Sequence, residues 1–155
     1  MGYDIPAAMA EIAQWQSGVV SRQQLLEAGL SAQLIKRRLE RGRWQQMHWG
    51  VYAAFTGPPP RTAWLWAAVL RAGPGAVLSH LTAAELHGLL DTPAELIFVT
   101  VPSTRRISAP GLVVRTSERI AEATSPAASR RGQAWRRPCS TWPSSPGPST
   151  MPAAS

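Results

Sequence analysis

Cysteine, lysine and long apolar runs are scarce in this chain of 155 residues, and each shortage excludes a class of protein. The single cysteine, Cys139, cannot form an intramolecular disulfide or a cysteine-based metal site. The single lysine, Lys36, lies within a predicted surface helix, which leaves none for a nuclease centre that combines carboxylates with a lysine. No stretch approaches the roughly 18 apolar residues of a membrane helix, and no signal peptide begins the chain. We therefore expect a cytoplasmic protein without membrane contact.

Positive charge is what the chain has in excess. The formal net charge of +7 and the isoelectric point near 11.2 suggest an anionic partner such as nucleic acid. However, the arginines at positions 130, 131, 136 and 137 supply four of these charges, and residues 124–155, in which they lie, contain no acidic residue. This stretch has no Ile, Leu, Val, Phe or Tyr and is rich in Ser, Pro and Ala, so we expect a disordered tail over 121–155. The net charge of the rest of the chain is modest, so a prediction of nucleic-acid binding must depend on where individual basic side chains lie.

The first 56 residues predict three helices and a hairpin. A helix over 6–16 has apolar residues at helical spacing. Ser21 and Gln24 form a capping box that opens a second helix, and Leu25 and Leu26 are expected to turn inward.

A tight turn separates the second helix from the third. Gly29 tolerates the left-handed conformation that ends a helix, and Ser31 caps the next helix, which runs over 31–41. Two strands over 43–48 and 51–55 follow as a hairpin. Helix, helix, short turn, helix and hairpin is the order of a winged helix-turn-helix.

The third helix has one apolar and one polar face. At 100° per residue, Leu34, Ile35 and Leu39 point inward, whereas amide and basic side chains fall on the other side. Arginine and lysine pair with guanine edges and glutamine with adenine, which suits a recognition helix in the major groove with the hairpin as a wing beside it. The predicted DNA-binding residues are Arg22, Gln23, Ser31, Gln33, Lys36, Arg37, Arg41, Arg43, Gln45 and His48.

A plainer interpretation of the same helix stands beside this one. A basic helix face is usually just solvated, and Glu40 on this face repels phosphate. Arg38 projects toward the apolar side, where a packed structural role is as reasonable as a DNA contact. The helix-turn-helix spacing and the hairpin that follows favour DNA over simple solvation.

Residues 57–60, Gly-Pro-Pro-Pro, predict a stiff linker to a second domain over 61–120. This domain is expected to be a small α+β unit that is incomplete, because apolar sequence stops near residue 120. Its predicted elements are helices over 62–71 and 79–89 and strands over 97–101 and 112–115.

No group of side chains in the second domain indicates catalysis. His80 and His87 lie two helical turns apart with Glu85 between them, but no third ligand has metal spacing, so packing and capping explain them better. Trp64 and Trp66 suit a core or a protein contact better than base stacking. We expect a protein that is not an enzyme and binds no metal or cofactor.

Several short motifs are spread over the two predicted domains. The first carries GVVSRQQLL from Gly18, GLS from Gly29, RGRW from Arg41 and HWGVYA from His48, and the second carries SHLTAA from Ser79. Together they resemble AbiEi-type antitoxins, winged helix-turn-helix transcriptional regulators of type IV toxin–antitoxin systems. The resemblance implies promoter binding and autoregulation by the first domain. It implies neutralisation of a nucleotidyltransferase-like toxin, or co-repression, by the second.

The resemblance stops after about residue 120. The family continues with a strand and a helix that carries a Thr-Leu-Leu-Asp-Leu-Ala-like run, whereas this chain reads RRPCSTWP from Arg136. Back-translated with chosen, GC-rich third bases and read from the third base of each codon, that segment becomes Ala-Thr-Leu-Leu-Asp-Leu-Ala. We therefore hypothesise that a frameshift produced the tail and truncated the second domain, which resequencing of the coding DNA would test.

The sequence thus predicts an α+β chain made of a winged helix-turn-helix, a small incomplete α+β domain and a disordered tail. Its predicted function is repression of its own promoter through a recognition helix (31–41) and a wing (43–55), with double-stranded DNA and a possible cognate toxin as partners. Two alternatives stay open: a protein-interaction module that neutralises or co-represses with a nucleotidyltransferase-like toxin, and a non-functional remnant of a longer nuclease-bearing protein. The oligomeric state is left open.

Overall fold

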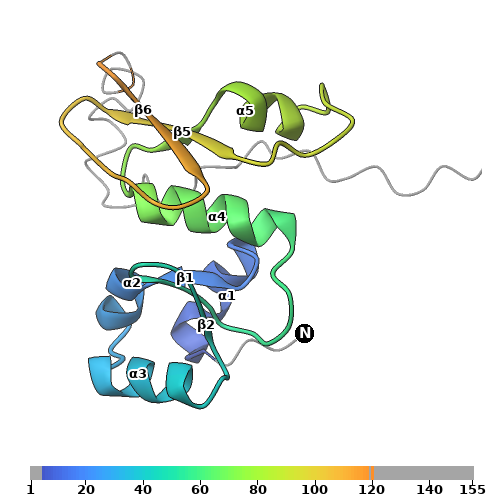
Figure 1. The fold of residues 1–155 in the computed structure, drawn as a ribbon. Coiled ribbons are helices and arrows are strands. Elements are labelled where there is room, and N and C mark those ends of the chain that lie inside the picture. Colours follow the sequence, from blue (N-terminus) through green and yellow to red (C-terminus); the bar gives the residue numbers. More distant parts are fainter. Residues whose placement is uncertain (1–4, 119, 121–155) are drawn as a thin grey trace, which may run out of the picture.

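The computed structural model of the chain describes residues 5–118 and residue 120. In this part of the chain the elements are α1 (Ala7–Trp15), β1 (Val19–Ser21), α2 (Arg22–Glu27), α3 (Ala32–Glu40), β2 (Gln45–His48), β3 (Val51–Ala53), α4 (Arg61–Ala72), β4 (Val77–Leu78), α5 (His80–Leu86), β5 (Ile97–Pro102) and β6 (Leu112–Ser117). They form two small sheets, ordered β1-β3-β2 and β4-β5-β6, with α4 between them (Figure 1). This is the α+β class that the sequence predicts. The predicted tail over 121–155 lies outside the described residues.

The helices of the first half begin where local chemistry predicts. The predicted capping box of α2 is present: the Gln24 N–H donates to Ser21 Oγ at 3.2 Å, and the Ser21 N–H donates to Gln24 Oε1 at 2.8 Å. Ser31 Oγ accepts the Leu34 N–H at 3.3 Å and caps α3. Gly29, between the two helices, has φ of +87°, a conformation that costs glycine little. These contacts satisfy N–H groups that a helix start would otherwise leave without a partner.

The hairpin is shorter than predicted, and a third strand joins it. β2 and β3 pair antiparallel across a two-residue turn, Trp49–Gly50, and begin or end within two residues of the predicted limits. The segment Val19–Ser21 pairs antiparallel with the other edge of β3, so β3 is the central strand. The partner of residues 19–21 is therefore a strand that follows about 30 residues later in the chain.

One face of this first sheet packs on α1, α2 and α3. Leu25 is fully buried there, but Leu26 is 44% exposed, so the prediction that both turn inward is wrong for Leu26. Adjacent helical positions point 100° apart, and a helix of six residues has room for one inward row. The buried residues of this core are Met9, Ala13, Val20, Leu25, Leu30, Ile35, Trp44, Tyr52 and Ala54.

The opposite face of the first sheet packs on α4. Because side chains alternate along a strand, Val20 points to the helices and Val19 points to α4. Val19 forms a separate cluster with Val51 and with two alanines of α4, Ala63 and Ala67. Alanine keeps the helix backbone close to the sheet, which explains the small residues on this side of α4.

A second side of α4 packs on the second sheet. Leu65, Ala68 and Ala72 share a core with β5 residues, including Ile97 and Val99. A helix that is apolar on two sides is buried on two sides, and α4 belongs to the packing of both sheets. Residues 57–60, which precede it, form no helix or strand, and the predicted domain limits stay a prediction.

The second sheet combines both strand orientations. β4 pairs antiparallel with β5, whereas β5 and β6 pair parallel along their full length. The connection over 103–111 returns across the molecule, where Ile107 packs on the core and Arg105 Nη1 donates to the Ala72 carbonyl at 3.1 Å. Arg105 thus caps the C-terminal end of α4, and a Cβ at Gly73, which has φ of +84°, would overlap its guanidinium group.

Candidate nucleic-acid interface

The polar face of α3 is exposed, as the helical periodicity predicts. Ile35 is buried in the first core, and Leu34 and Leu39 pack against it from the sides. Gln33, Lys36, Arg37 and Arg41 are all exposed on the opposite side. The two leucines and Ile35 therefore fix the rotation of α3 and leave these four side chains available to a partner.

Two charged side chains on this face form a weak pair. Lys36 Nζ lies 3.7 Å from Glu40 Oε1, one helical turn away, and both side chains are more than half exposed. Exposed pairs of this spacing contribute roughly 0.3–0.5 kcal/mol, so a phosphate can displace the carboxylate from Lys36 at little cost.

Arg38 has the packed role that the plainer interpretation allows. Its Cζ lies 5.0 Å from the centroid of the Trp44 ring, and Trp44 is almost fully buried. A guanidinium group over an indole face is attracted by the ring quadrupole. Arg38 therefore packs the C-terminal part of α3 against the core, whereas its neighbour Arg37 is exposed to solvent.

The start of α2 contributes two further exposed side chains. Arg22 and Gln23 are exposed, and Gln23 Nε2 donates to Glu27 Oε1 at 3.0 Å within the same helix. The Arg22 backbone N–H donates to the Gly50 carbonyl at 2.8 Å, which joins the start of α2 to the hairpin turn. Ser31, at the start of α3, is exposed as well.

The hairpin departs from the prediction at two of its three predicted contact residues. Arg43 is exposed between α3 and β2. Gln45, however, is partly buried, and its Nε2 donates to the carbonyls of Phe55 at 3.0 Å and Gly57 at 2.7 Å. Those contacts hold the exit of the hairpin and occupy the amide that the prediction assigns to DNA.

The prediction for His48 is wrong, because the structure buries this side chain under α4. His48 is 7% exposed, and its imidazole ring lies edge-on to the indole ring of Trp64 on α4, with the two ring centroids 6.1 Å apart. Burial lowers the pKa of His48, and the nearby Arg71 charge lowers it further. The cause is an irregularity in the register between Gln46 and His48, which sets His48 opposite Val51 on the face that α4 covers. The burial of His48 could not be predicted from nearby residues, because it depends on a bulge in strand pairing and on a helix that follows later in the chain.

Trp49 at the hairpin turn and Arg71 on α4 lie side by side, and neither was predicted to be functional. Trp49 is 77% exposed, and Arg71 of α4 has its Cζ 5.7 Å from the Trp49 ring centroid. The exposure of Trp49 could have been predicted from the sequence, because Trp49 and Gly50 form the two-residue turn between the predicted strands. The approach of Arg71 depends on how α4 packs, which local sequence does not reveal.

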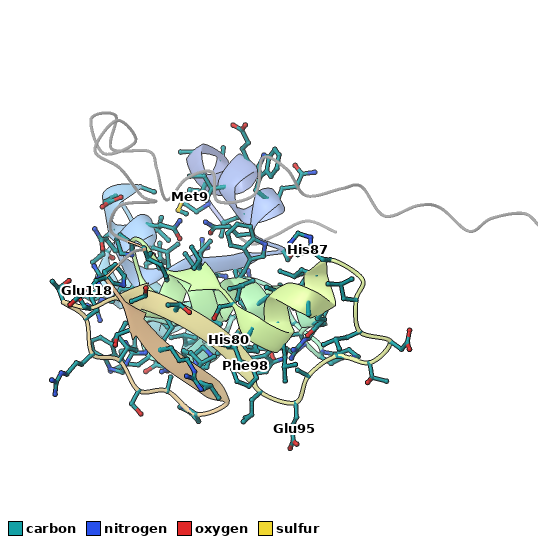
Figure 2. All side chains as sticks on the ribbon, turned by 90° about the horizontal axis from the view of Figure 1, so that it is seen from above. Met9, His80, His87, Glu95, Phe98 and Glu118 are labelled. Carbon is teal, nitrogen blue, oxygen red and sulfur yellow. The ribbon has the colours of Figure 1, made fainter. Side chains whose placement is uncertain are left out.

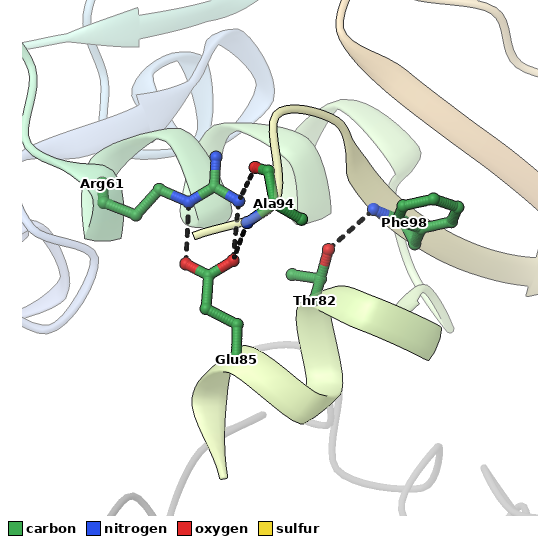
Figure 3. A network of polar contacts seen from close by, with 5 residues as sticks. All are labelled: Arg61, Thr82, Glu85, Ala94 and Phe98. Carbon is green, nitrogen blue, oxygen red and sulfur yellow. Dashed lines mark hydrogen bonds and ion pairs between the residues drawn. The ribbon is translucent and has the colours of Figure 1, made fainter. Parts of the chain in front are cut away.

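Polar side chains of the second half bind one another instead of facing outward (Figure 3). Arg61 donates from Nε and Nη2 to the two carboxylate oxygens of Glu85, each at 2.8 Å, and also from Nη2 to the Ala94 carbonyl. These hydrogen bonds lower the pKa of Glu85 and raise that of Arg61. Thr82, one helical turn before Glu85, accepts the Phe98 N–H at 2.8 Å.

The SHLTAA motif therefore has a structural explanation. Ser79 Oγ accepts the Thr100 hydroxyl at 2.8 Å, and the His80 ring lies 5.9 Å from the Phe98 ring where α5 covers β5 (Figure 2). With Thr82 these residues attach α5 to β5. His87 lies at the far end of the helix in the same view, and no three His, Cys, Asp or Glu side chains gather as metal ligands in the described part of the chain. None of the helices in that part is long and apolar enough to cross a bilayer.

The comparison with known families concerns the first half of the chain. Residues 8–54 match the family model described as transcriptional regulator, AbiEi antitoxin. The matched segment runs from α1 through the β2–β3 hairpin and confirms the predicted family there. No curated protein matches the chain. The resemblance of residues 61–120 stays a prediction.

Proposed function

We propose that the chain is a DNA-binding transcriptional regulator of the antitoxin type, which represses its own promoter through a winged helix-turn-helix. In this proposal α3 is the recognition helix and the β2–β3 hairpin is the wing. The observation that carries it is the exposed amide and basic face of α3, within a segment that matches a family of antitoxin transcriptional regulators. The proposed role is non-enzymatic.

The distribution of charge supports a DNA partner for the first half. Among the described residues, the first half (positions 5–60) contains six Lys or Arg and three Glu, whereas the second half (positions 61–118) contains five Arg and four Asp or Glu. Most of the excess positive charge therefore lies with the first sheet and its three helices. A duplex presents a dense row of phosphates, and a surface of this sign is attracted to it.

A gel-shift titration with the DNA upstream of the chain's own gene tests this function. Replacing Lys36 and Arg37 by Ala removes two predicted contacts and is expected to weaken specific binding at least about tenfold, since a lost base contact costs roughly 1–3 kcal/mol. The matched control replaces Arg106 and Arg115, two exposed arginines of the second half, and should bind like the wild type. Equal binding by both double variants would contradict the assignment of α3.

A second candidate is a protein-interaction module, and the surface of the second half favours it. Leu81, Leu89 and Leu96 are each at least 44% exposed there, and the charge of this half is close to balanced. An exposed set of leucines is typical of a surface that contacts protein. Co-purification with a nucleotidyltransferase-like product of the adjacent gene, lost when Leu89 is changed to Asp, would support this role, and an intact longer reading frame would support a remnant instead.

A further inference from the structure

We propose that the loop over 87–96, the leucine loop, is a preformed docking site for a separate protein that presents an apolar groove bordered by basic side chains. The loop joins α5 to β5 and lies outside the family-matched segment. This inference rests on the second candidate function, the protein-interaction module, and gives it a surface and a partner of defined chemistry. It does not depend on DNA binding by α3.

The leucine loop begins with a turn that fixes its backbone. Gly88 has φ of +69°, its N–H donates to the Glu85 carbonyl at 3.1 Å, and the Leu89 N–H donates to the Ala84 carbonyl at 2.9 Å. These bonds form a Schellman motif, in which the residue after the glycine commonly packs back on the helix. Here the positions that it would meet are two alanines, Ala83 and Ala84, and Leu89 is 75% exposed. The turn therefore holds Leu89 in place and leaves its side chain in solvent.

The other end of the leucine loop is held by the polar network of Figure 3. The Ala94 carbonyl accepts from Arg61 Nη2 at 2.8 Å, and the Ala94 N–H donates to Glu85 Oε2 at 3.3 Å. Both ends of the loop are therefore bound to the last turn of α5, and the exposed Leu96 follows two residues after Ala94. An apolar side chain on a fixed backbone loses little conformational entropy when a partner covers it, which favours binding.

The charge around the leucine loop determines which partner it fits. Residues 73–104 contain three acidic residues and no Lys or Arg. Two of the three, Asp91 and Glu95, are exposed on the loop itself. Such a surface repels nucleic acid and anionic lipid, and it attracts a protein surface that carries Lys or Arg. Together with the exposed leucines, it fits an apolar groove with a basic border.

A second copy of the chain fits this surface less well than a separate protein does. Two leucine loops facing each other would bring like charges together. The basic first half of another copy would attract the loop, but that contact joins two different surfaces, and contacts of this kind run on into open chains. It would also cover basic side chains that the proposed function assigns to DNA.

The position of the leucine loop leaves α3 open. α5 with this loop and α3 lie at opposite ends of the molecule, with α4 and the first sheet between them (Figure 1). A protein bound to the loop therefore does not cover the polar face of α3, and one chain can hold the protein partner and DNA together.

A nuclear magnetic resonance titration of the full chain tests the inference. The probe is a helical peptide of leucine and lysine with one apolar face, and a peptide with glutamate in place of lysine is its control. The first peptide should shift the amide resonances of the leucine loop, and the second should not. Leu89→Ser should weaken binding of the first peptide about tenfold, because the burial of one leucine is lost. Leu26→Ser, at an exposed leucine of α2, is the matched control and should bind like the wild type. Asp91→Asn should weaken binding roughly two- to threefold at low salt.

A second measurement needs no variant. In the free wild-type chain the ¹⁵N order parameters of the leucine loop should match those of α5, near about 0.85, and values below about 0.6 would show that the site is not preformed. Equal affinities of Leu89→Ser and Leu26→Ser for the lysine peptide, or tighter binding of the glutamate peptide, would overturn the inference. Self-association of the wild type that Leu89→Ser abolishes would assign the loop to a second copy and overturn the proposed partner.

The same experiments separate this inference from the proposed functions. If the lysine peptide binds the leucine loop and promoter DNA does not bind the chain, the inference stands and the DNA-binding function fails. If the peptide binds and the product of the adjacent gene does not, the docking site stands and the proposed toxin partner fails. If DNA binds through α3 and the peptide leaves the loop resonances unchanged, only this inference fails.

Discussion

The two halves of the molecule are stabilised by different kinds of contact. The first half has a core of large aliphatic and aromatic side chains, with Trp44 and Tyr52 at 6.4 Å between ring centroids. The second half has a core of alanine, valine, leucine and isoleucine. Side-chain hydrogen bonds add to it: Arg61 with Glu85, Thr82 with the Phe98 N–H, and Arg105 with the end of α4.

This difference determines which side chains each half can offer to a partner. Because packing holds the first half together, most of its cations stay on the surface, where Lys36 and Arg37 face outward. In the second half Arg61 donates to Glu85 and Arg105 donates to the Ala72 carbonyl, so both arginines form hydrogen bonds within the fold. The surface of this half exposes several leucines. A DNA-binding role for the first half and a protein-binding role for the second are consistent with this division.

The largest effect is expected from the core of the first half. Trp44→Ala removes a buried indole and the surface on which Arg38 packs, and should lower the free energy of unfolding by about 3–5 kcal/mol. Urea denaturation followed by circular dichroism measures this loss. Trp15→Ala, at a tryptophan that is 62% exposed, is the control and should change stability little. Similar losses for the two variants would show that Trp44 is not central to this core.

A smaller effect is expected from the polar contacts of the second half. Glu85→Gln leaves the Arg61 guanidinium without its carboxylate and should cost about 1–3 kcal/mol at pH 7. Arg61 holds the pKa of Glu85 below its usual range, so the stabilisation is present above about pH 4.3, the ordinary glutamate value, and is lost as the pH falls through the lowered pKa. The difference between wild type and variant should therefore shrink in acid.

Urea denaturation at pH 7 and at pH 3 measures that difference. Glu95→Gln changes an exposed carboxylate on the same half and should match the wild type at both values (Figure 2). A difference between wild type and Glu85→Gln that is the same at both pH values would show that the Arg61 ion pair does not stabilise the fold.

The smallest effect is expected where α4 joins the two halves. Burial, and then the charge of Arg71, lower the pKa of His48, so the unfolded chain takes up the proton first as the pH falls below about 6.5. Stability present above that value is lost as the pH falls through the lowered pKa. His48→Phe should remove this part of the pH dependence, measured as unfolding free energy from pH 7.5 to 5, whereas His87→Gln should keep it. If the unfolding free energy of His48→Phe changed with pH as steeply as that of the wild type, another group would be responsible for the pH dependence.

The parts that the sequence predicted well depend on neighbours in the chain. The capping box at Ser21 and Gln24, the left-handed Gly29 and the two faces of α3 all involve residues within about four positions of one another. Hydrogen bonds and side-chain rows at that spacing follow from helix geometry alone. Leu26 shows the limit of this reasoning, because a short helix can bury one leucine of an adjacent pair and expose the other.

The exposure of the candidate site could also be predicted where it depends on neighbours in the chain. Eight of the ten predicted contact residues are exposed, and those on α3 follow from its periodicity. Gln45 and His48 depart from the prediction because the hairpin's exit and its register irregularity depend on pairing with β3. Arg71 was outside the prediction, since nothing near it in the sequence indicates that α4 returns to the hairpin.

The sequence by itself determined the helix starts, the exposed basic face of α3 and the family of residues 8–54, because each depends on local spacing or on a run of motifs. Tertiary structure alone decided that α4 packs on both sheets, that His48 is buried beneath it and that Arg71 stands beside Trp49. Those contacts join residues more than ten positions apart, such as His48 and Trp64 or Trp49 and Arg71. They follow from which apolar surfaces α4 covers when the chain folds back. Periodicity orients a side chain on its own helix or strand, whereas burial depends on what packs against it.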